Sequence, residues 1–386
     1  MKPESSLRNN IKLLRTRLGL SQQDLAKVAG VSRQMISGVE SGKYAPSVTI
    51  ALSLATALGC TVEDLFSLEA DSFNIEAIPT QAVPAGQHLR VTLAKVGGRL
   101  IAYPLLGSEA FRTVMISADG EGWRRTEDSP FEVKLKTKPE TINRTVAIAG
   151  CTPVLPLWAK VAENWHPDLR VYWSEANSME ALQRLIRGEV HIAGMHLYNS
   201  ETRSYNESFV AQALTNKVAM LINLGFWSEG LLVKPGNPKG LRTVADLAGS
   251  DIKIINREPG SGSRQLLERL LCEQQIPEAQ VQGFEHVVNT HLVVAKTVAC
   301  GLVDAGVGTQ AVATAFGLGF IPLHWSRYDL VILKDYLEET PVQQLLDTLA
   351  HRRLHQQLAS LGGYDTNQTG EVVASIGGNN REAMDC

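Results

Sequence analysis

The sequence predicts a multidomain protein with an all-α head, a small β-rich middle segment and a long α/β body. Its 386 residues suffice for two or three domains of roughly 100–200 residues each. Residues 7–66 carry apolar side chains at three- and four-residue steps, which predicts helices. Short alternating runs between Gly and Pro residues over 75–138 predict strands. From Arg144 onward strand and helix patterns alternate, which predicts parallel βαβ units.

The head is predicted to hold a series of short helices. Ser21 followed by Asp24 favours a capping box at the start of the second helix. Gly30 suits a left-handed turn, and Ser32 caps the third helix. The first predicted helix carries an apolar stripe made of Leu7, Ile11, Leu14 and Leu18. The further helices are predicted over 22–28, over 32–40 and from Pro46 onward.

The second and third helices with their turn match a known DNA-binding pattern. The stretch LGLSQQDLAKVAGVSRQMISGVESGKYAPS resembles the Xre/phage-repressor helix-turn-helix family along the whole head. The resemblance implies that the third helix reads the major groove, where Arg33 can pair with guanine and Gln34 with adenine. It further implies a homodimer on double-stranded DNA, and an internal salt bridge between Arg15 and Glu40. The predicted DNA-binding residues are Gln22, Ser32, Arg33, Gln34, Ser37 and Lys43.

Three further positions complete this interpretation: Gln22 at the start of the second helix, Gly38 in the third helix and Lys43 just after it. Gln22 and Lys43 are expected at phosphates. Gly38 is expected to face outward with Ser37, and it carries no side chain where some relatives contact a base. The alternative for the head is a small helical bundle that binds another protein.

Charge is distributed unevenly along the chain. The formal net charge of -3 alone argues weakly against a nucleic-acid partner. Residues 1–66, however, hold eight Lys and Arg against five Asp and Glu, a formal +3, which leaves −6 for the remainder. No apolar run of about 18 residues predicts a membrane span, and the polar, basic N-terminus does not resemble a signal peptide. The five Cys residues never form a C-x-x-C pair, which favours a reducing cytoplasm over a disulfide framework or zinc module.

The middle segment is expected to form a small antiparallel sheet or barrel. Alternating runs cover 88–93, 99–103 and 131–137, and residues 96–99 suit a hairpin turn. Two roles stay open for this segment. It is a spacer and dimer contact, or it holds a ligand of its own.

The body contains four segments in which small or hydroxyl residues stand between a strand end and a helix start. Such helix N-termini present unpaired amides and the positive end of the helix dipole. Several of them meeting at the carboxyl ends of parallel strands form an anion site. Each alone is equally explained as a helix cap. The segments are 150–153, 177–178, 259–264 and 289–291.

The order of motifs in the body resembles a second known family, the periplasmic-binding-protein-like domain related to molybdate- and tungstate-binding proteins. The resemblance covers roughly 144–375 and implies two α/β lobes with a ligand between them. It places the crossovers near 224–232 and 321–330. The motifs are AGCTPVLPLWA, EALQRLIRGEVHIAGMHLYN, GLLVKPGNPKGLRTVADLA, NREPGSGSRQLLE, THLVVAKTVACGLVDAGVGTQAVA and GGYDTNQTGEVV.

The candidate ligand residues come from the four segments. Thr152 stands where relatives commonly carry His or Asp, and this departure favours an anion because it removes a carboxylate. The predicted ligand-binding residues are Thr152, Ser178, Ser261, Gly262, Ser263, Arg264, Thr290 and His291.

Several side chains near these segments can be interpreted in two ways. Arg264 either faces the cleft or pairs with an acidic surface residue. His196 and His291 either approach the ligand or are structural, and Tyr198 and Tyr328 are similarly ambiguous. Cys151 is a reactive thiol at a helix start or simply packs, and packing is favoured because no base is evident beside it.

The predicted fold class is thus an all-α helix-turn-helix head, a small β-rich middle segment and a two-lobed α/β periplasmic-binding-protein-like (type II) body. Its domains are expected at 1–70, 71–140 and 141–375, with a tail over 376–386. The predicted function is a cytoplasmic, ligand-responsive transcriptional regulator that senses an oxyanion such as molybdate or tungstate. We expect no catalytic residues, metal site, cofactor or membrane partner. Two alternatives are an enzyme or binding protein of molybdenum-cofactor metabolism with a DNA-binding head, and a constitutive DNA-binding protein whose body only dimerises.

Overall fold

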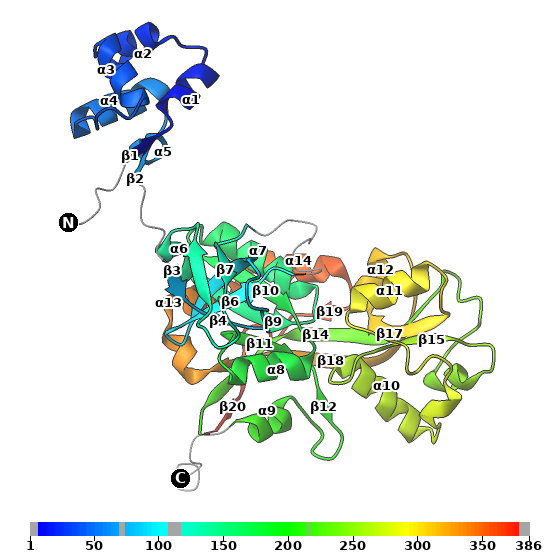
Figure 1. The fold of residues 1–386 in the computed structure, drawn as a ribbon. Helices are drawn as coiled ribbons and strands as arrows, with labels where there is room; N and C mark the ends of the chain where they lie inside the picture. The colour runs from blue at the N-terminus through cyan, green and yellow to red at the C-terminus, as the bar shows by residue number, and fades with distance from the viewer. Residues whose placement is uncertain (1–6, 69–73, 107–116, 215, 378–386) are drawn as a thin grey trace. The chain divides into compact units, whose positions relative to one another are not determined.

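The computed structural model describes residues 7–68, 74–106, 117–214 and 216–377 (Figure 1). The chain divides into two compact units, Met1–Ile75 and Glu76–Cys386. The junction predicted at residue 70 and nearly all of the predicted tail over 376–386 lie outside the described residues. Every described helix is too short or too polar to cross a bilayer.

The first unit is a helical head, as predicted. Ser21 and Asp24 form the predicted capping box, and Gly30 adopts the left-handed conformation with φ 68°. The predicted ion pair between Arg15 and Glu40 is also present, with Nε and Oε1 2.6 Å apart. The helices are α1 (Ile11–Arg17), α2 (Gln22–Ala29), α3 (Arg33–Glu40), α4 (Val48–Leu58) and α5 (Val62–Leu65).

Two expectations for the head were wrong. Leu7 does not extend the first helix, because β1 (Leu7–Asn9) pairs antiparallel with β2 (Phe66–Leu68). Gly38 does not face outward but is buried under the ring of Tyr44. A Cβ added at Gly38 would lie 2.3 Å from Cζ of Tyr44, so the ring occupies the place of a side chain.

The β-rich segment begins the second unit as a six-stranded sheet in the order β3-β8-β7-β5-β6-β4. The predicted hairpin is present, since Gly97 and Gly98 both adopt positive φ between β5 and β6. The sheet is mixed rather than antiparallel throughout, because β4 runs parallel to β6. Its strands are β3 (Asn74–Glu76), β4 (Ile78–Pro79), β5 (Leu89–Val96), β6 (Arg99–Pro104), β7 (Gly120–Trp123) and β8 (Glu132–Leu135).

This sheet packs directly against the α/β part of the unit. The guanidinium of Arg170 donates to both carboxylate oxygens of Asp119, at 2.5 and 2.8 Å. Arg99 donates to the carbonyl oxygen of Gly188 at 2.9 Å, and the rings of Tyr103 and Tyr172 lie 4.3 Å apart. The segment that we expected to be a connector domain therefore shares a core with the first lobe.

The first lobe is built on parallel strands, as the alternating pattern predicted. In the large sheet β9 pairs parallel with β10 on one side and with β11 on the other. The helices α7 and α8 follow β9 and β10 directly. The elements are α6 (Pro139–Asn143), β9 (Thr145–Gly150), α7 (Val154–Trp165), β10 (Arg170–Glu175), α8 (Ser178–Ile186), β11 (Ile192–Met195), β12 (Tyr198–Asn199), β13 (Ser204–Tyr205) and α9 (Glu207–Ala213).

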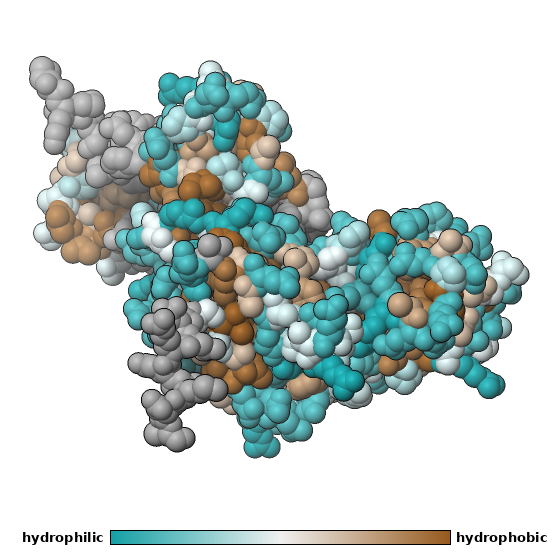
Figure 2. Space-filling model, turned by 90° about the horizontal axis from the view of Figure 1, so that it is seen from below, coloured by the Kyte–Doolittle hydropathy of each residue, from teal (hydrophilic) through white to brown (hydrophobic). Residues whose placement is uncertain are grey.

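The second lobe has its own apolar core. Here β15 pairs parallel with β16 and with β17. On the face shown in Figure 2 the surface of this lobe is mostly hydrophilic. Its elements are β15 (Ile254–Arg257), α10 (Gly262–Glu273), β16 (Val287–Val288), α11 (His291–Ala299), β17 (Ala305–Thr309) and α12 (Gln310–Ala315).

Two long antiparallel strands join the lobes. β14 (Ala219–Val233) and β18 (Gly319–Leu333) pair along their whole length and run from the first lobe into the second (Figure 1). They contain both predicted crossovers. Register shifts between Asn223 and Gly225 and between Glu229 and Gly230 interrupt the ladder where the strands pass between the lobes.

The C-terminal part returns to the first lobe. It begins with two helices, α13 (Thr340–Asp347) and α14 (Arg352–Leu361), which are separated by a short 3-10 turn. β19 (Tyr364–Asp365) and β20 (Val372–Ile376) then pair with β14. The predicted fold class of head, β-rich segment and two-lobed α/β body is confirmed.

Candidate functional site

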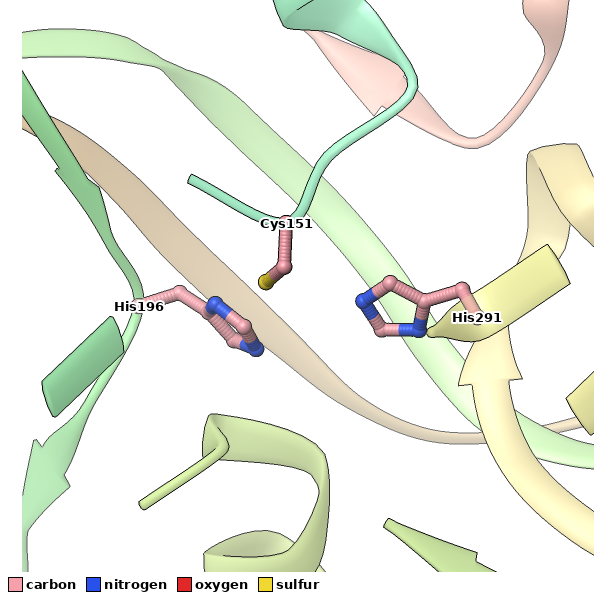
Figure 3. A group of neighbouring side chains, drawn as sticks. All are labelled: Cys151, His196 and His291. Carbon is pink, nitrogen blue, oxygen red and sulfur yellow. The ribbon is translucent and has the colours of Figure 1, made fainter. Parts of the chain in front are cut away.

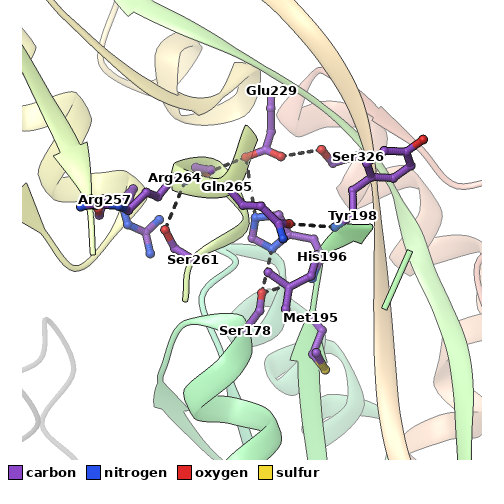
Figure 4. Close-up of polar contacts among 12 residues, drawn as sticks. Ser178, Met195, His196, Tyr198, Glu229, Arg257, Ser261, Arg264, Gln265 and Ser326 are labelled. Carbon is purple, nitrogen blue, oxygen red and sulfur yellow. Dashed lines mark hydrogen bonds and ion pairs between the residues drawn. The ribbon is translucent and has the colours of Figure 1, made fainter. Parts of the chain in front are cut away.

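The first lobe supplies side chains at the carboxyl ends of its parallel strands. Cys151 and Thr152 follow β9, and His196 follows β11; all three are buried. Thr152 caps its own turn, since its Oγ1 accepts from the amide of Val154 at 3.2 Å. Ser178, the first residue of α8, accepts from the amide of His196 at 3.2 Å. These contacts hold the imidazole of His196 toward the second lobe (Figure 4).

The second lobe meets this surface with the start of α10. The hydroxyl of Ser261 caps the helix by accepting from the amide of Arg264 at 3.3 Å. Gly262 packs against His196 so closely that an added Cβ would lie 2.4 Å from the imidazole and the carbonyl oxygen. The amide of Met179 in α8 donates to the carbonyl oxygen of Gly260 at 3.2 Å. Glycine at 262 therefore allows the lobes to touch.

A second helix start of that lobe brings in His291. Thr290 caps α11 by accepting from the amide of Val293 at 3.0 Å, which places His291 in the first turn. The ring centroids of His291 and His196 lie 6.1 Å apart, and both rings pack near Trp227. Neither nitrogen of His291 has a hydrogen-bond partner within the described residues.

One group of these residues has the chemistry of a metal site. The Sγ of Cys151 and ring nitrogens of His196 and His291 all lie within 4.8 Å of one another (Figure 3). Thiol and imidazole are the ligands that Zn²⁺ and related ions prefer. We predicted no metal site because these residues are far apart in the sequence and show no ligand spacing.

A buried ion pair borders this group. Arg257, the last residue of β15, is 1% exposed and donates through Nε and Nη2 to Glu258 at 2.8 and 3.0 Å. Its Nη2 also donates to the carbonyl oxygen of Asn289 at 2.8 Å. Its Nη1 has no hydrogen-bond partner in the described part of the chain. Arg257 is thus the cation of the site, and Glu258 neutralises it.

Arg264 belongs to the surface of the second lobe. Its Nε donates to Glu268 one turn along α10 at 2.7 Å, and its guanidinium lies over the ring of Phe284 at 4.9 Å. Of the two interpretations left open for Arg264, the structure shows the pairing with an acidic residue. Of the other predicted ligand residues in the second lobe, Gly262 and His291 lie against His196 of the first lobe.

Burial sets the protonation of these groups. It lowers the pKa of His291 well below its ordinary value, and Arg257 and His196 add to this effect. Burial also lowers the pKa of His196, against the opposing effect of Glu229. The pKa of the Cys151 thiol rises to about 11 through burial, although Arg257 acts to lower it. At neutral pH both imidazoles are neutral and the thiol is protonated.

Glu229 links the site to the long strands. It is 1% exposed, and its two carboxylate oxygens accept from the hydroxyls of Ser263 and Ser326, both at 2.5 Å. Its Oε1 lies 3.7 Å from Nε2 of His196. Because Glu229 sits on β14 and Ser326 on β18, the carboxylate joins both crossovers to the start of α10.

A small cavity lies beside the site. Its volume is about 10 Å³, and it is lined by Thr152, Trp227, Tyr328 and Tyr364, with Val154, Leu224 and Gly225. That is about the space of a single water molecule. A ligand larger than water must therefore displace these side chains in order to enter this cavity.

Sequence reasoning missed some of these residues as a site. Cys151 was assigned to packing, and His196, Glu229 and Arg257 were not among the predicted ligand residues. The available signal was position, because Cys151, His196 and Arg257 each stand at the carboxyl end of a parallel-sheet strand. The same rule selected the four loops.

In the head the predicted DNA-facing residues lie on and beside α3. Ser32, Arg33, Gln34, Ser37 and Lys43 are all exposed. Ser32 caps the helix by accepting from the amide of Met35 at 3.1 Å. Gln22 instead turns inward, since its Nε2 donates to Glu40 at 2.8 Å. Tyr44, which sequence reasoning did not select, lies across Gly38 and donates to the carbonyl oxygen of Gln34 at 3.1 Å.

Comparison with known proteins gives the family. A helix-turn-helix model matches residues 11–65, and a PBP superfamily domain model matches residues 159–350. The uncharacterized protein YvgK of Bacillus subtilis is 36% identical over 230 residues, which cover 59% of this chain and 73% of YvgK. This chain belongs to the same family as YvgK, and it carries a helix-turn-helix at residues 11–65 and a PBP superfamily domain at residues 159–350.

Further relatives match the two parts of this helix-turn-helix PBP protein separately. The uncharacterized HTH-type transcriptional regulator YgzD of Bacillus subtilis is 39% identical over 66 residues, 17% of this chain and 100% of YgzD. A putative phosphate ABC transporter substrate-binding protein with bound phosphate from Clostridium perfringens is 13% identical, with a TM-score of 0.42. That match covers 57% of this chain and 98% of the other, and at this score it carries no argument about the ligand.

Proposed function

We propose that this helix-turn-helix PBP protein is a ligand-responsive transcriptional regulator. Its head binds operator DNA, and its body senses a small ligand where the two lobes meet. The ligand is an oxyanion such as molybdate or tungstate, and the protein acts in the cytoplasm as a homodimer. In this account the residues on α3 contact bases, while Lys43 contacts phosphate.

One observation carries the proposal. Side chains from both lobes meet at a buried centre, in a chain that also carries a helix-turn-helix. Because the binding residues come from both lobes, ligand binding depends on the distance between the two lobes. A ligand that favours one arrangement of the lobes shifts that equilibrium by its difference in affinity for the two arrangements. The names of the HTH-type relatives support the same role for the head.

Four features of the centre support an anion as the ligand. Several helix N-termini face it, and their dipoles favour negative charge. Arg257 directs a guanidinium nitrogen without a partner among the described residues into the same region. Neutral imidazoles of His196 and His291 supply further N–H donors. Ser261 and Thr152 add hydroxyl groups from opposite lobes.

A thermal-shift experiment on the full chain tests the ligand class. We expect molybdate or tungstate to raise the melting temperature of the body, since a ligand at a hundred times its dissociation constant stabilises by about 2.7 kcal/mol. Sulfate and phosphate serve as comparison anions. Thr152→Val and Ser261→Ala should reduce the shift, whereas Thr314→Val, an exposed position on α12, should leave it unchanged. No shift with any of these anions would exclude the oxyanion.

A further inference from the structure

The three side chains Cys151, His196 and His291 come from different places in the fold. Cys151 and His196 follow β9 and β11 of the first lobe, while His291 opens α11 of the second lobe (Figure 3). Their ligand atoms lie within 4.8 Å of one another. The three side chains are no more than 3% exposed. The group is therefore a contact between lobes as well as a cluster of ligating atoms.

The imidazole nitrogens of the group lack ordinary partners among the described residues, whereas the Cys151 thiol interacts with Arg257. Nε2 of His196 and both ring nitrogens of His291 make no hydrogen bond within the described residues. Cys151 is a free thiol, and forms no disulfide with any described cysteine. Buried polar groups are nearly always hydrogen-bonded, because an unsatisfied one costs about 1–3 kcal/mol. Several such atoms pointing at one another indicate a missing partner that binds them together.

The charges around the group favour a cation. Arg257 and Glu258 neutralise each other. The carboxylate of Glu229 accepts only hydroxyl hydrogen bonds and forms no ion pair with Lys or Arg in the described structure, and it lies 3.7 Å from His196. Glu229 is therefore an unpaired negative charge beside the group. Cys151 is a neutral thiol until an ion binds, and loss of its proton on binding adds a second negative charge, so that a divalent ion balances both.

We propose that Cys151, His196 and His291 bind a thiophilic metal ion, Zn²⁺ or a related divalent cation, that bridges the two lobes. One sulfur and two imidazole ligands leave a fourth position of a tetrahedral ion open. Binding releases the thiol proton of Cys151 to solvent as the metal–sulfur bond forms. An oxyanion can occupy this open position of the metal ion. Binding of an oxyanion there rests on the proposed function, whereas the metal site itself does not.

Binding of the ion couples to the distance between the lobes. Bonds of about 2.0–2.3 Å to nitrogen and sulfur hold two tetrahedral ligands about 3.3–3.8 Å apart. The three ligand atoms lie within 4.8 Å of one another, so an ion bound to them fixes the distance of His291 from Cys151 and His196. Because His291 moves with the second lobe, the ion stabilises the closed arrangement.

Metal binding is measured on the full chain after treatment with a chelator. Co²⁺ is added first, because a cobalt–thiolate bond gives a charge-transfer absorption in the near ultraviolet, and Zn²⁺ is then used to displace it. We expect one equivalent per chain and loss of the absorption on displacement. Fewer than one equivalent, or binding without the thiolate absorption, would overturn the metal site.

Variants identify the ligands. Cys151→Ser should abolish the thiolate absorption, and His291→Gln should weaken binding by more than the roughly 10- to 100-fold that loss of a supporting contact costs. Cys272→Ser, at an exposed cysteine of α10, is the matched control and should bind as the wild type does. Unchanged binding by both site variants would contradict the assignment. Circular dichroism of each metal-free variant verifies that the variant folds. If a variant does not fold, the number of metal ions bound per wild-type chain still decides whether the metal site exists.

One experiment distinguishes failure of the metal site from failure of the proposed oxyanion response. Molybdate and tungstate are tested for thermal stabilisation of metal-free and of Zn²⁺-loaded protein. Stabilisation by an anion in a protein that binds no metal removes the metal site and keeps the proposed function. Stoichiometric metal binding without any response to the anions keeps the metal site and removes the oxyanion. A larger anion shift in the Zn²⁺-loaded protein supports both.

Discussion

The recognition helix of the head and the centre between the lobes solve the placement of functional groups in opposite ways. Arg33, Gln34 and Ser37 are neighbours on one exposed helix, α3. Cys151, His196 and His291 are distant in the sequence and buried between two lobes. The head presents these polar groups on its surface, where they are exposed to solvent and accessible to a large binding partner. The centre removes its polar groups from water and leaves several of them without a hydrogen-bond partner in the described part of the chain.

This difference decides what each region tolerates. A substitution on α3 changes a surface and leaves the packed residues of the head, such as Ile36 and Val39, in place. A substitution at the centre disturbs packing, hydrogen bonding and charge together, because buried groups depend on one another. We therefore expect stability effects at the centre and affinity effects at α3, and the predictions below are ordered by expected size.

The largest effect is expected for Arg257→Met. This change leaves Glu258 without its cation and removes the hydrogen bond to Asn289. Loss of one partner of a buried ion pair costs 3–5 kcal/mol, and because Glu258 is partly exposed we expect about 3 kcal/mol. Urea unfolding of the body measures it. Lys239→Met, in an exposed pair with Asp251, is the control and should cost at most about 1 kcal/mol.

An unchanged unfolding midpoint for the Arg257 variant would mean that the centre behaves like an exposed surface. The contrast between the two regions would then be wrong.

Arg33→Ala should weaken DNA binding without changing the stability of the body. A bidentate contact to a base contributes about 1–3 kcal/mol, which corresponds to roughly 5- to 150-fold in affinity. Fluorescence anisotropy with DNA selected from a random pool by the wild-type protein measures the change. Arg17→Ala, in the last turn of α1, is the control. Equal affinity of the wild type and the Arg33 variant would show that α3 does not read bases.

The smallest effect is expected for Arg264→Ala. Its side chain lies partly exposed between Glu268 and the ring of Phe284, so we expect a stability loss of about 0.5–1 kcal/mol. The thermal shift produced by an oxyanion should stay as in the wild type. Ser261→Ala is measured in the same experiment for comparison. If Arg264→Ala also loses the thermal shift, Arg264 contacts the ligand, and the lobes must rearrange on binding.

Most of the head was predictable because its signals are local. Ser21, Gly30 and Ser32 fix helix ends within a few residues, and all three act as predicted. Leu7 was mispredicted because helical spacing cannot reveal that β1 pairs with β2. Gly38 was mispredicted because the ring that covers it comes from a loop beyond the helix.

The body was predictable in outline and not in its centre. Strand and helix alternation predicted the βαβ order, but it did not predict that β14 continues for 15 residues from the first lobe into the second. The rule that sites lie at the carboxyl ends of parallel strands selected Thr152 and Ser261, whose role in ligand binding stays a prediction. It was not applied to His196 or Arg257, since a single His or Arg in a sequence carries no indication of what lies opposite to it.

The central claim is that a ligand at the interlobe centre changes DNA binding by the head. The most direct test is the DNA affinity of the full chain, measured by anisotropy with and without saturating molybdate or tungstate, both metal-free and with Zn²⁺. The account predicts a change of roughly 5- to 150-fold, which corresponds to a coupling free energy of 1–3 kcal/mol, and its loss in Cys151→Ser. Equal DNA affinity under all of these conditions, in a protein that the anion or the metal stabilises, would contradict it.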